Sequence, residues 1–247
     1  MGKRVVELIQ ANPNTDILLT AFTHSAVDNM ISAVVSALSL ANLSTKVNDP
    51  LRLHVNNPNK DLHLWNSANI VASTTLGLTH PYFTWRKAMF DYAIVDEASQ
   101  MLEPICYAAI RLARKTILAG DHLQLGPVVK TAGSILQISL FEKNCLSHPQ
   151  NVTTLHVQYR MNDKIQEVVN EIIYHPRGIA LVAANESVAN NYLDSEPVVE
   201  YIQCDDVANV TKSVTNQSES DNILDIVVKL VGMNFSTALN CTLSLMH

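Results

Sequence analysis

The sequence predicts an α/β fold built on a parallel β-sheet. Four short apolar segments rich in β-forming residues are separated by helical or irregular stretches, as the crossover connections of a parallel sheet require. Each segment is followed directly by residues that carry hydroxyl, carboxylate or amide groups. Ligands of open α/β sheets bind at the carboxyl ends of the strands. These polar residues therefore predict a binding site at that edge.

The expected elements alternate along the chain. After the end of an amphipathic helix at 5–11, strands are expected at 17–22, 70–74, 92–95 and 115–119, with further strands at 152–157 and 198–202. Helices are expected at 25–38, 104–112, 134–141 and 221–231, and another helix carries Ile165, Val168, Val169, Ile172 and Ile173 on one side. The polar stretches 42–67 and 211–220 indicate a surface excursion and a linker.

Composition limits the classes of function. The formal net charge is -6 and the pI is near 5.8, so no broad basic face for nucleic acid is indicated. The four cysteines lie far apart, which predicts that this stretch encodes neither a zinc site nor an iron–sulfur cluster. The longest apolar stretch, 30–43, is interrupted by serines and is too short to span a bilayer, so no membrane association is expected.

The third expected strand ends abruptly in two carboxylates, Asp96 and Glu97. Acidic residues do not continue a buried strand, so the chain must reach the surface there. Two acids at the carboxyl end of such a strand suit a nucleotide site, where one holds Mg²⁺ and the other takes a proton from the attacking water. The alternative is an acidic turn that only solvates the end of the strand.

The segment Thr23–Ser25 leads from the first strand into a helix. Ser25 and Asp28 are expected to form a capping box, which places the free N–H groups of the helix beside the loop. Such a helix start attracts phosphate oxygens. An ordinary capped helix explains the same residues equally well.

Five motifs occur in one order along the chain. They are T-H-S-A-V-D-N at 23–29, V-A-S-T-T at 71–75, I-V-D-E-A-S-Q at 94–100, A-G-D-H-L-Q-L-G-P at 119–127 and V-Q-Y-R-M at 157–161. Together they resemble the superfamily 1 helicases, in the branch of the RNA-decay helicases and the replication helicase–nuclease, and they are most similar to the latter. The resemblance implies a RecA-like P-loop NTPase sheet that uses ATP and Mg²⁺.

The resemblance also implies a role for each matching residue at the nucleotide. Asp96 would hold the Mg²⁺ of MgATP, Glu97 would polarise the attacking water, and Gln124 would sense the γ-phosphate. The loop that carries Gln124 would be shaped by Gly120 and Asp121. From a second motor domain, Arg160 would reach the γ-phosphate and Gln158 would contact the nucleotide.

The resemblance also implies which residues face single-stranded nucleic acid. They are Thr23, His24, Thr74 and Thr75. Hydroxyls and backbone N–H groups bond phosphate oxygens without a basic patch, which suits an acidic chain. For His24, packing beside the helix cap is the alternative.

Departures from the family pattern predict a fragment. No G-x-x-x-x-G-K-[ST] loop is present; Gly2-Lys3 matches its end, and Arg4 stands where the Mg²⁺-binding hydroxyl belongs. Gly126 replaces a proline, and the later helicase motifs and the nuclease residues are missing. We expect most of a first RecA-like domain at 1–148, the start of a second at 149–232, and a tail at 233–247 without family signal.

The resemblance implies an ATP-dependent 5′–3′ DNA helicase that moves on single-stranded DNA in the nucleus. Two alternatives stay open at this point. An RNA helicase of the same branch shares the motifs. A catalytically dead remnant that binds nucleic acid or protein would explain the missing phosphate loop.

Overall fold

The structure is a computed structural model, and it describes residues 1–43, 50–53, 67–81, 83, 89–184, 199, 202–203, 209–210 and 214–231. The chain divides into two compact units, Met1–Thr153 and Thr154–His247. Each is described by itself. Among the described residues, no helix combines the length and the apolar character that a membrane span needs.

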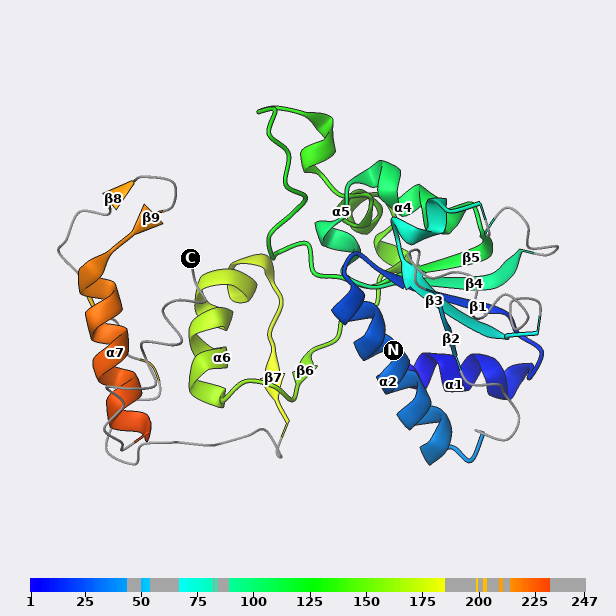
Figure 1. Ribbon diagram of the computed structural model, residues 1–247, viewed down its shortest axis with the longest axis horizontal. Coiled ribbons are helices and arrows are strands. Elements are labelled where there is room, and N and C mark those ends of the chain that lie inside the picture. The colour runs from blue at the N-terminus through cyan, green and yellow to red at the C-terminus, as the bar shows by residue number, and fades with distance from the viewer. Residues whose placement is uncertain are drawn as a thin grey trace. The chain divides into compact units, whose positions relative to one another are not determined.

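Unit 1 is built on a five-stranded parallel sheet with the order β2-β3-β1-β4-β5 (Figure 1). The strands are β1 (Ile17–Ala21), β2 (Leu51–Arg52), β3 (Ile70–Thr74), β4 (Phe90–Val95) and β5 (Ala113–Leu118). In the central register, Ile17 of β1 pairs with Ile70 on one side and with Tyr92 on the other. The predicted α/β class with a parallel sheet is confirmed.

The four predicted strands of this sheet are present, and a fifth lies where a surface excursion was expected. Strand β2 falls inside 42–67 and pairs with β3 through Leu51 and Val71. It has only two residues, which is too short for a periodic pattern to reveal.

Helices cover both faces of this sheet. They are α1 (Gly2–Ala11), α2 (His24–Leu40), α4 (Glu103–Ile110) and α5 (Leu140–Ser147), with short 3₁₀ turns η2 (Gly77–Thr79), η3 (Ala98–Gln100), η4 (Ile135–Gln137) and η5 (Pro149–Asn151). The helix expected at 134–141 is wrong. Its place is taken by η4, and α5 starts only after Ser139, whose Oγ accepts the N–H of Glu142 at 3.1 Å and caps the helix.

The core lies in two layers, one on each face of the sheet. Neighbouring strand residues point to opposite faces and so enter different layers. Leu18 and Ala93 belong to the layer formed with α4 and α5. Leu19 and Ile94 belong to the layer formed with α1 and α2. All residues of β1 are buried, so this strand is covered on both faces, as a central parallel strand should be.

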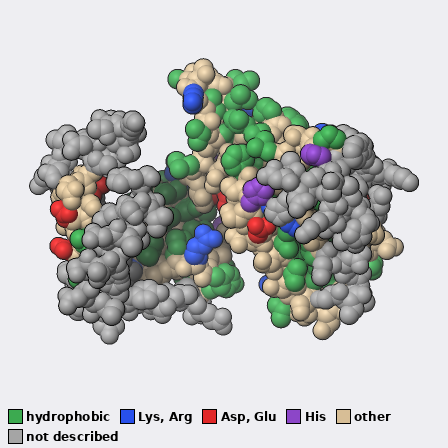
Figure 2. All heavy atoms as spheres, viewed as in Figure 1, with side chains coloured by type: hydrophobic (Ala, Val, Ile, Leu, Met, Phe, Trp, Pro, Cys, Tyr) green, Lys and Arg blue, Asp and Glu red, His purple; other side chains and the backbone are tan. Residues whose placement is uncertain are grey.

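Between β5 and α5 the chain follows a long segment, 119–139, with little regular structure. Several of its apolar side chains are exposed, among them Leu125, Val128 and Ile135. Figure 2 shows hydrophobic side chains reaching the surface there. The hydrophobic pattern that suggested a helix at 134–141 thus belongs partly to a surface segment.

The described residues of unit 2 form short strands and the helices α6 and α7. The strands are β6 (Val157–Gln158) and β7 (Val182–Ala183), which are parallel, and β8 (Asn209–Val210) and β9 (Val214–Thr215), which are antiparallel. Helix α6 (Asp163–Val169) continues into a π-helical turn (Asn170–Tyr174) and a 3₁₀ turn (His175–Arg177), and α7 spans Gln217–Val231.

The expected strand at 152–157 therefore forms only at Val157, and α7 begins inside the expected linker 211–220. Of the expected strand 198–202, the structure describes only 199 and 202, and the tail 233–247 lies outside the described residues.

The buried side of α6 is polar. Gln166 and Asn170 are buried, and both donate a side-chain amide to the carbonyl of Leu181 at 2.9 Å. Asn170 Oδ1 also accepts the N–H of Leu181 at 3.0 Å. These amides tie the helix to the segment that enters β7. The apolar residues Ile165 and Ile172 are instead exposed.

Candidate functional site

The carboxyl ends of β4 and β5 are joined beyond the strands themselves. The N–H of Ala119 donates to the carbonyl of Val95 at 2.8 Å, and the N–H of Ala98 donates to the carbonyl of Ala119 at 2.8 Å. On the other side, the N–H of Asp96 bonds the carbonyl of Thr20 in β1, also at 2.8 Å. The acidic turn and the loop after β5 therefore lie next to each other at one edge of the sheet.

Glu97 has a left-handed backbone conformation, with φ 54° and ψ 35°. For a residue with a Cβ atom this conformation costs about 1–2 kcal/mol. The strand ends here, and the turn η3 follows at once. The side chain is exposed, and its Oε2 accepts a hydrogen bond from Nε2 of Gln100 at 3.0 Å. The strained turn thus presents a carboxylate to solvent, held by one amide.

Asp96 is partly buried beside it. Burial raises the pKa of its carboxyl group, while a hydrogen bond from the N–H of Glu97 and the positive charge of the chain's amino terminus act against that rise. In the part of the chain that the structure describes, no lysine or arginine side chain forms an ion pair with Asp96. A partly desolvated carboxylate of this kind gains from a nearby cation.

The pH dependence of stability should reveal this carboxylate. Because the pKa of Asp96 is raised in the folded protein, the folded state binds the proton more tightly than the unfolded chain does, and the ionised group lowers stability. The penalty is absent below the ordinary value of 3.8 and complete above the folded pKa. Asp96→Asn should therefore raise the urea midpoint at pH 7, with a gain that shrinks toward pH 4.

Glu97→Gln, which removes the neighbouring charge from an exposed side chain, is the matched control for that series. A midpoint for Asp96→Asn below that of the unmodified chain at pH 7 would contradict the prediction.

The loop after β5 is folded by Asp121. Its Oδ1 accepts the N–H of Leu123 at 2.9 Å, and its Oδ2 accepts Nε2 of Gln124 at 3.1 Å. Its own N–H donates to Oγ of Ser99 at 3.2 Å. Gln124 is exposed. The predicted residues Asp96, Glu97, Gly120, Asp121 and Gln124 are thus gathered at one edge of the sheet.

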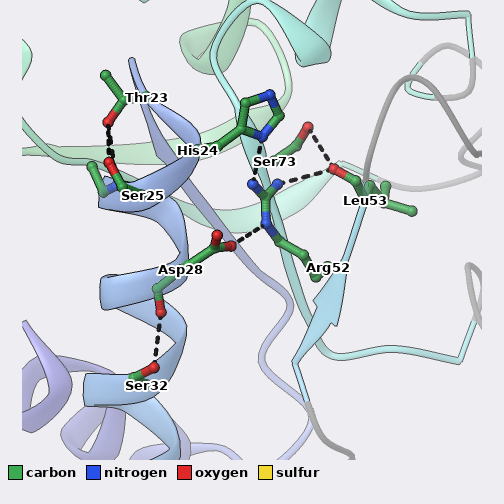
Figure 3. Close-up of polar contacts among 9 residues, drawn as sticks. Thr23, His24, Ser25, Asp28, Ser32, Arg52, Leu53 and Ser73 are labelled. Carbon is green, nitrogen blue, oxygen red and sulfur yellow. Dashed lines mark hydrogen bonds and ion pairs between the residues drawn. The ribbon is translucent and has the colours of Figure 1, made fainter. Parts of the chain in front are cut away.

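Thr23 and His24 lie at the start of α2, and His24 faces Arg52 of β2 (Figure 3). Thr23 is the N-cap, because its Oγ1 accepts the N–H of Ala26 at 3.2 Å; the capping box expected from Ser25 and Asp28 is wrong. His24 Nδ1 lies 2.9 Å from Nη2 of Arg52, and Nε of the same guanidinium bonds Asp28 at 2.7 Å. Sequence reasoning missed Arg52, because this contact depends on the unforeseen strand β2.

Thr74 and Thr75 lie at the expected edge, but their side chains are buried. Thr75 is 0% exposed, and its hydroxyl bonds the carbonyl of Ala21 at 3.0 Å and lies 3.3 Å from the hydroxyl of Thr20. Thr74 Oγ1 accepts the N–H of Gly77 at 3.2 Å. The expectation that these hydroxyls face a nucleic acid strand is corrected, since the Thr75 hydroxyl joins the ends of β1 and β3 and the Thr74 hydroxyl bonds within the turn that follows β3.

Gln158 and Arg160 belong to unit 2. Both polar atoms of the Gln158 side chain are bonded: Oε1 accepts the N–H groups of Arg160 and Met161 at 2.8 and 2.7 Å, and Nε2 donates to the carbonyl of Met161 at 2.8 Å and to Gln166 of α6 at 2.9 Å. Arg160 is exposed. Gln158 thus shapes the backbone that presents the guanidinium, a role that its predicted contact with a nucleotide did not anticipate.

Comparisons with known proteins agree with the motifs. Two family models, each described as AAA domain, match residues 51–132 and 136–240. The DNA replication ATP-dependent helicase/nuclease dna2 of Schizosaccharomyces pombe is 38% identical over 193 residues, which are 72% of this chain and 13% of that protein. This chain belongs to the superfamily 1 helicases. The parallel sheet of unit 1, with helices on both faces, has the RecA-like architecture that this family implies.

Other relatives match over a similar range. DNA2 of Homo sapiens is 36% identical over 191 residues, 70% of this chain and 17% of that protein. An uncharacterized ATP-dependent helicase of Methanocaldococcus jannaschii is 33% identical over 187 residues, 68% of this chain and 27% of its own length. The chain thus spans less than a third of each. Among solved structures, the arterivirus nonstructural protein 10 helicase covers 74% of this chain and 38% of its own, with a TM-score of 0.42 and 18% identity.

Proposed function

We propose that this chain supplies part of the ATP-hydrolysing motor of a DNA replication and repair helicase that moves 5′ to 3′ on single-stranded DNA in the nucleus. The observation that carries the proposal is that the segments on either side of the Asp96–Glu97 turn are joined to the start of the Gly120–Gln124 loop at one sheet edge, by the backbone bonds of Ala119 with Val95 and Ala98 and by the bond from the Asp121 N–H to the Ser99 hydroxyl. The motifs on these two segments are those of the family, and several relatives are named as DNA replication ATP-dependent helicase/nucleases.

The residues at this edge fit Mg²⁺ in their donor chemistry. Mg²⁺ is usually bound by one or two carboxylates together with water and substrate phosphates. Asp96 would hold the ion, because its carboxylate is partly buried and forms no ion pair with a lysine or arginine side chain among the described residues. When bound, MgATP supplies the phosphoryl group that is transferred to water. Glu97 would polarise that water, with its carboxylate held by Gln100.

The remaining assignments concern groups that bind phosphate and nucleic acid. Gln124 would bond the γ-phosphate through its exposed amide, and Gly120 and Asp121 set the loop that holds it. Arg160, with Gln158 behind it, would stabilise charge on the phosphate from the second domain. Thr23 and His24 would contact the single strand at the start of α2. At Thr74 and Thr75 the hydroxyls are used internally, and the N–H of Thr75 also bonds the carbonyl of Ala21 at 2.9 Å, so a contact of this segment with the strand would have to use other backbone groups.

As an isolated polypeptide, the chain should hydrolyse ATP at or near background. Its 247 residues contain no G-x-x-x-x-G-K-[ST] loop, so the backbone cradle for the β- and γ-phosphates is missing from them. A malachite-green assay with single-stranded DNA measures the released phosphate. Clear turnover that Glu97→Gln abolishes would prove this prediction wrong, and turnover that survives Glu97→Gln would point to a contaminant.

One observation favours the second candidate, a catalytically dead remnant. Arg4 stands where the family has the Mg²⁺-binding hydroxyl, and its guanidinium is paired with Glu7 at 2.7 Å. Isothermal titration with MgATP separates the candidates, because a dead remnant gives no binding heat.

Competition between DNA and RNA oligonucleotides of one sequence tests the RNA helicase alternative, since the 2′-hydroxyl is the group that distinguishes them.

A further inference from the structure

Ser99 connects the turn after β4 to the loop after β5. Its side chain is buried, with 2% exposure, and its Oγ accepts the N–H of Asp121 at 3.2 Å. Gly120 lies against the same residue. A Cβ atom placed on Gly120 would come within 2.9 Å of the Ser99 backbone nitrogen and 3.1 Å of Ser99 Oγ. The two segments therefore meet backbone to backbone, with only one side-chain hydroxyl between them.

From Ser99 the contact continues to Gln124. Asp121, whose N–H is fixed by Ser99, uses one carboxylate oxygen to hold the N–H of Leu123 and the other to hold the side-chain amide of Gln124. On the opposite side, Ser99 lies two residues after Glu97, within η3, the turn that follows it. A single hydrogen bond, from the Asp121 N–H to the Ser99 hydroxyl, thus links the turn that follows Glu97 to the residue that holds the Gln124 amide.

We propose that Ser99 is a positioning residue that sets the Gln124 side chain relative to the Asp96–Glu97 turn. This role rests on the proposed function, because the placement of Gln124 matters to chemistry only if Gln124 contacts a nucleotide. Ser99 itself touches no reacting group in this scheme. It acts through Asp121: its loss would remove the hydrogen bond that fixes the Asp121 N–H, while the backbone bonds of Ala119 still join the loop to the acidic turn.

The test is amide hydrogen exchange and NMR of the ¹⁵N-labelled full chain, without nucleotide. In Ser99→Ala, exchange of the Asp121 N–H should rise about tenfold or more because its acceptor is gone. The side-chain NH₂ signals of Gln124 should move, because the carboxylate that holds them is no longer fixed. Ser99→Cys, which keeps a weaker acceptor at the same place, should move the same signals in the same direction by a smaller amount.

Ser139→Ala is the matched control. Ser139 is 1% exposed, and its Oγ also accepts one backbone N–H, that of Glu142 at 3.1 Å. It should lower stability by an amount similar to Ser99→Ala while leaving the Gln124 signals in place. Gln124 signals that stay unchanged in Ser99→Ala, or that move equally in Ser139→Ala, would overturn the proposal.

If Ser99→Ala does not fold, the comparison of Ser99→Cys with Ser139→Ala decides the question by the same signals. The outcome is separate from the proposed function, since a chain that never binds MgATP can still show that Ser99 positions the Gln124 side chain. Conversely, if Ser99 does not position Gln124, the proposed nucleotide site is unaffected.

Discussion

Replacing Asn170 with alanine should lower the local stability of the β6–β7 pair by about 2 kcal/mol. Asn170 is 6% exposed, and its side chain both donates to and accepts from the backbone of Leu181. Alanine removes both bonds and leaves the N–H of Leu181 without that acceptor. The amides of Val182 and Ala184, which bond the carbonyls of His156 and Gln158, report the pair directly. Their hydrogen exchange should accelerate by about 30-fold.

Asn170→Asp separates the two bonds. The aspartate keeps an acceptor for the Leu181 N–H but cannot donate to the Leu181 carbonyl, which Gln166 still reaches at 2.9 Å. Exchange in this variant should fall between that of the unmodified chain and that of Asn170→Ala. If Asn170→Ala leaves the hydrogen exchange of the Val182 and Ala184 amides unchanged, the side chain of Asn170 does not stabilise the β6–β7 pair.

Gly120→Ala should destabilise unit 1 by about 2 kcal/mol. The added methyl group would meet the backbone nitrogens of Ser99 at 2.9 Å and Ala98 at 3.3 Å. Backbone atoms of a turn that is bonded to Ala119 cannot move aside as a flexible side chain would. The loop must therefore shift away from the acidic turn. Urea denaturation followed by circular dichroism measures the loss.

Gly126→Ala is the control on the same loop. A Cβ atom there meets nothing closer than the Gln137 carbonyl oxygen at 3.5 Å, which is ordinary contact, so the change should be close to neutral. Equal midpoints for the two variants would mean that the close approach at Gly120 is not structurally important.

The sequence predicted the parallel sheet and the edge where its polar residues gather. This was possible because β1, β3 and β4 are long enough, and apolar enough, to be recognised from local composition, and because carboxylates cannot continue a buried strand. The position of Gln124 next to the acidic turn then follows from the adjacency of β4 and β5, which the family resemblance implied.

What could not be predicted depends on contacts between distant segments. Thr75 carries a hydroxyl at a strand end and so looks accessible, yet its partner is the carbonyl of Ala21, 54 positions away. Arg52 bonds Asp28 only because a two-residue strand, β2, joins the sheet. In α6 the apolar repeat was visible, but the buried amides of Gln166 and Asn170 bond the backbone of a later segment, which periodicity does not report.

Glu97 keeps a backbone conformation that glycine adopts without steric cost and that asparagine tolerates. Directed evolution for heat resistance alone would favour those two residues here and would discard the carboxylate in the same step. Thermal stability and the proposed role of the carboxylate thus place opposite demands on position 97. A library selected for both heat resistance and activity would retain Glu97 and acquire stabilising substitutions at other positions.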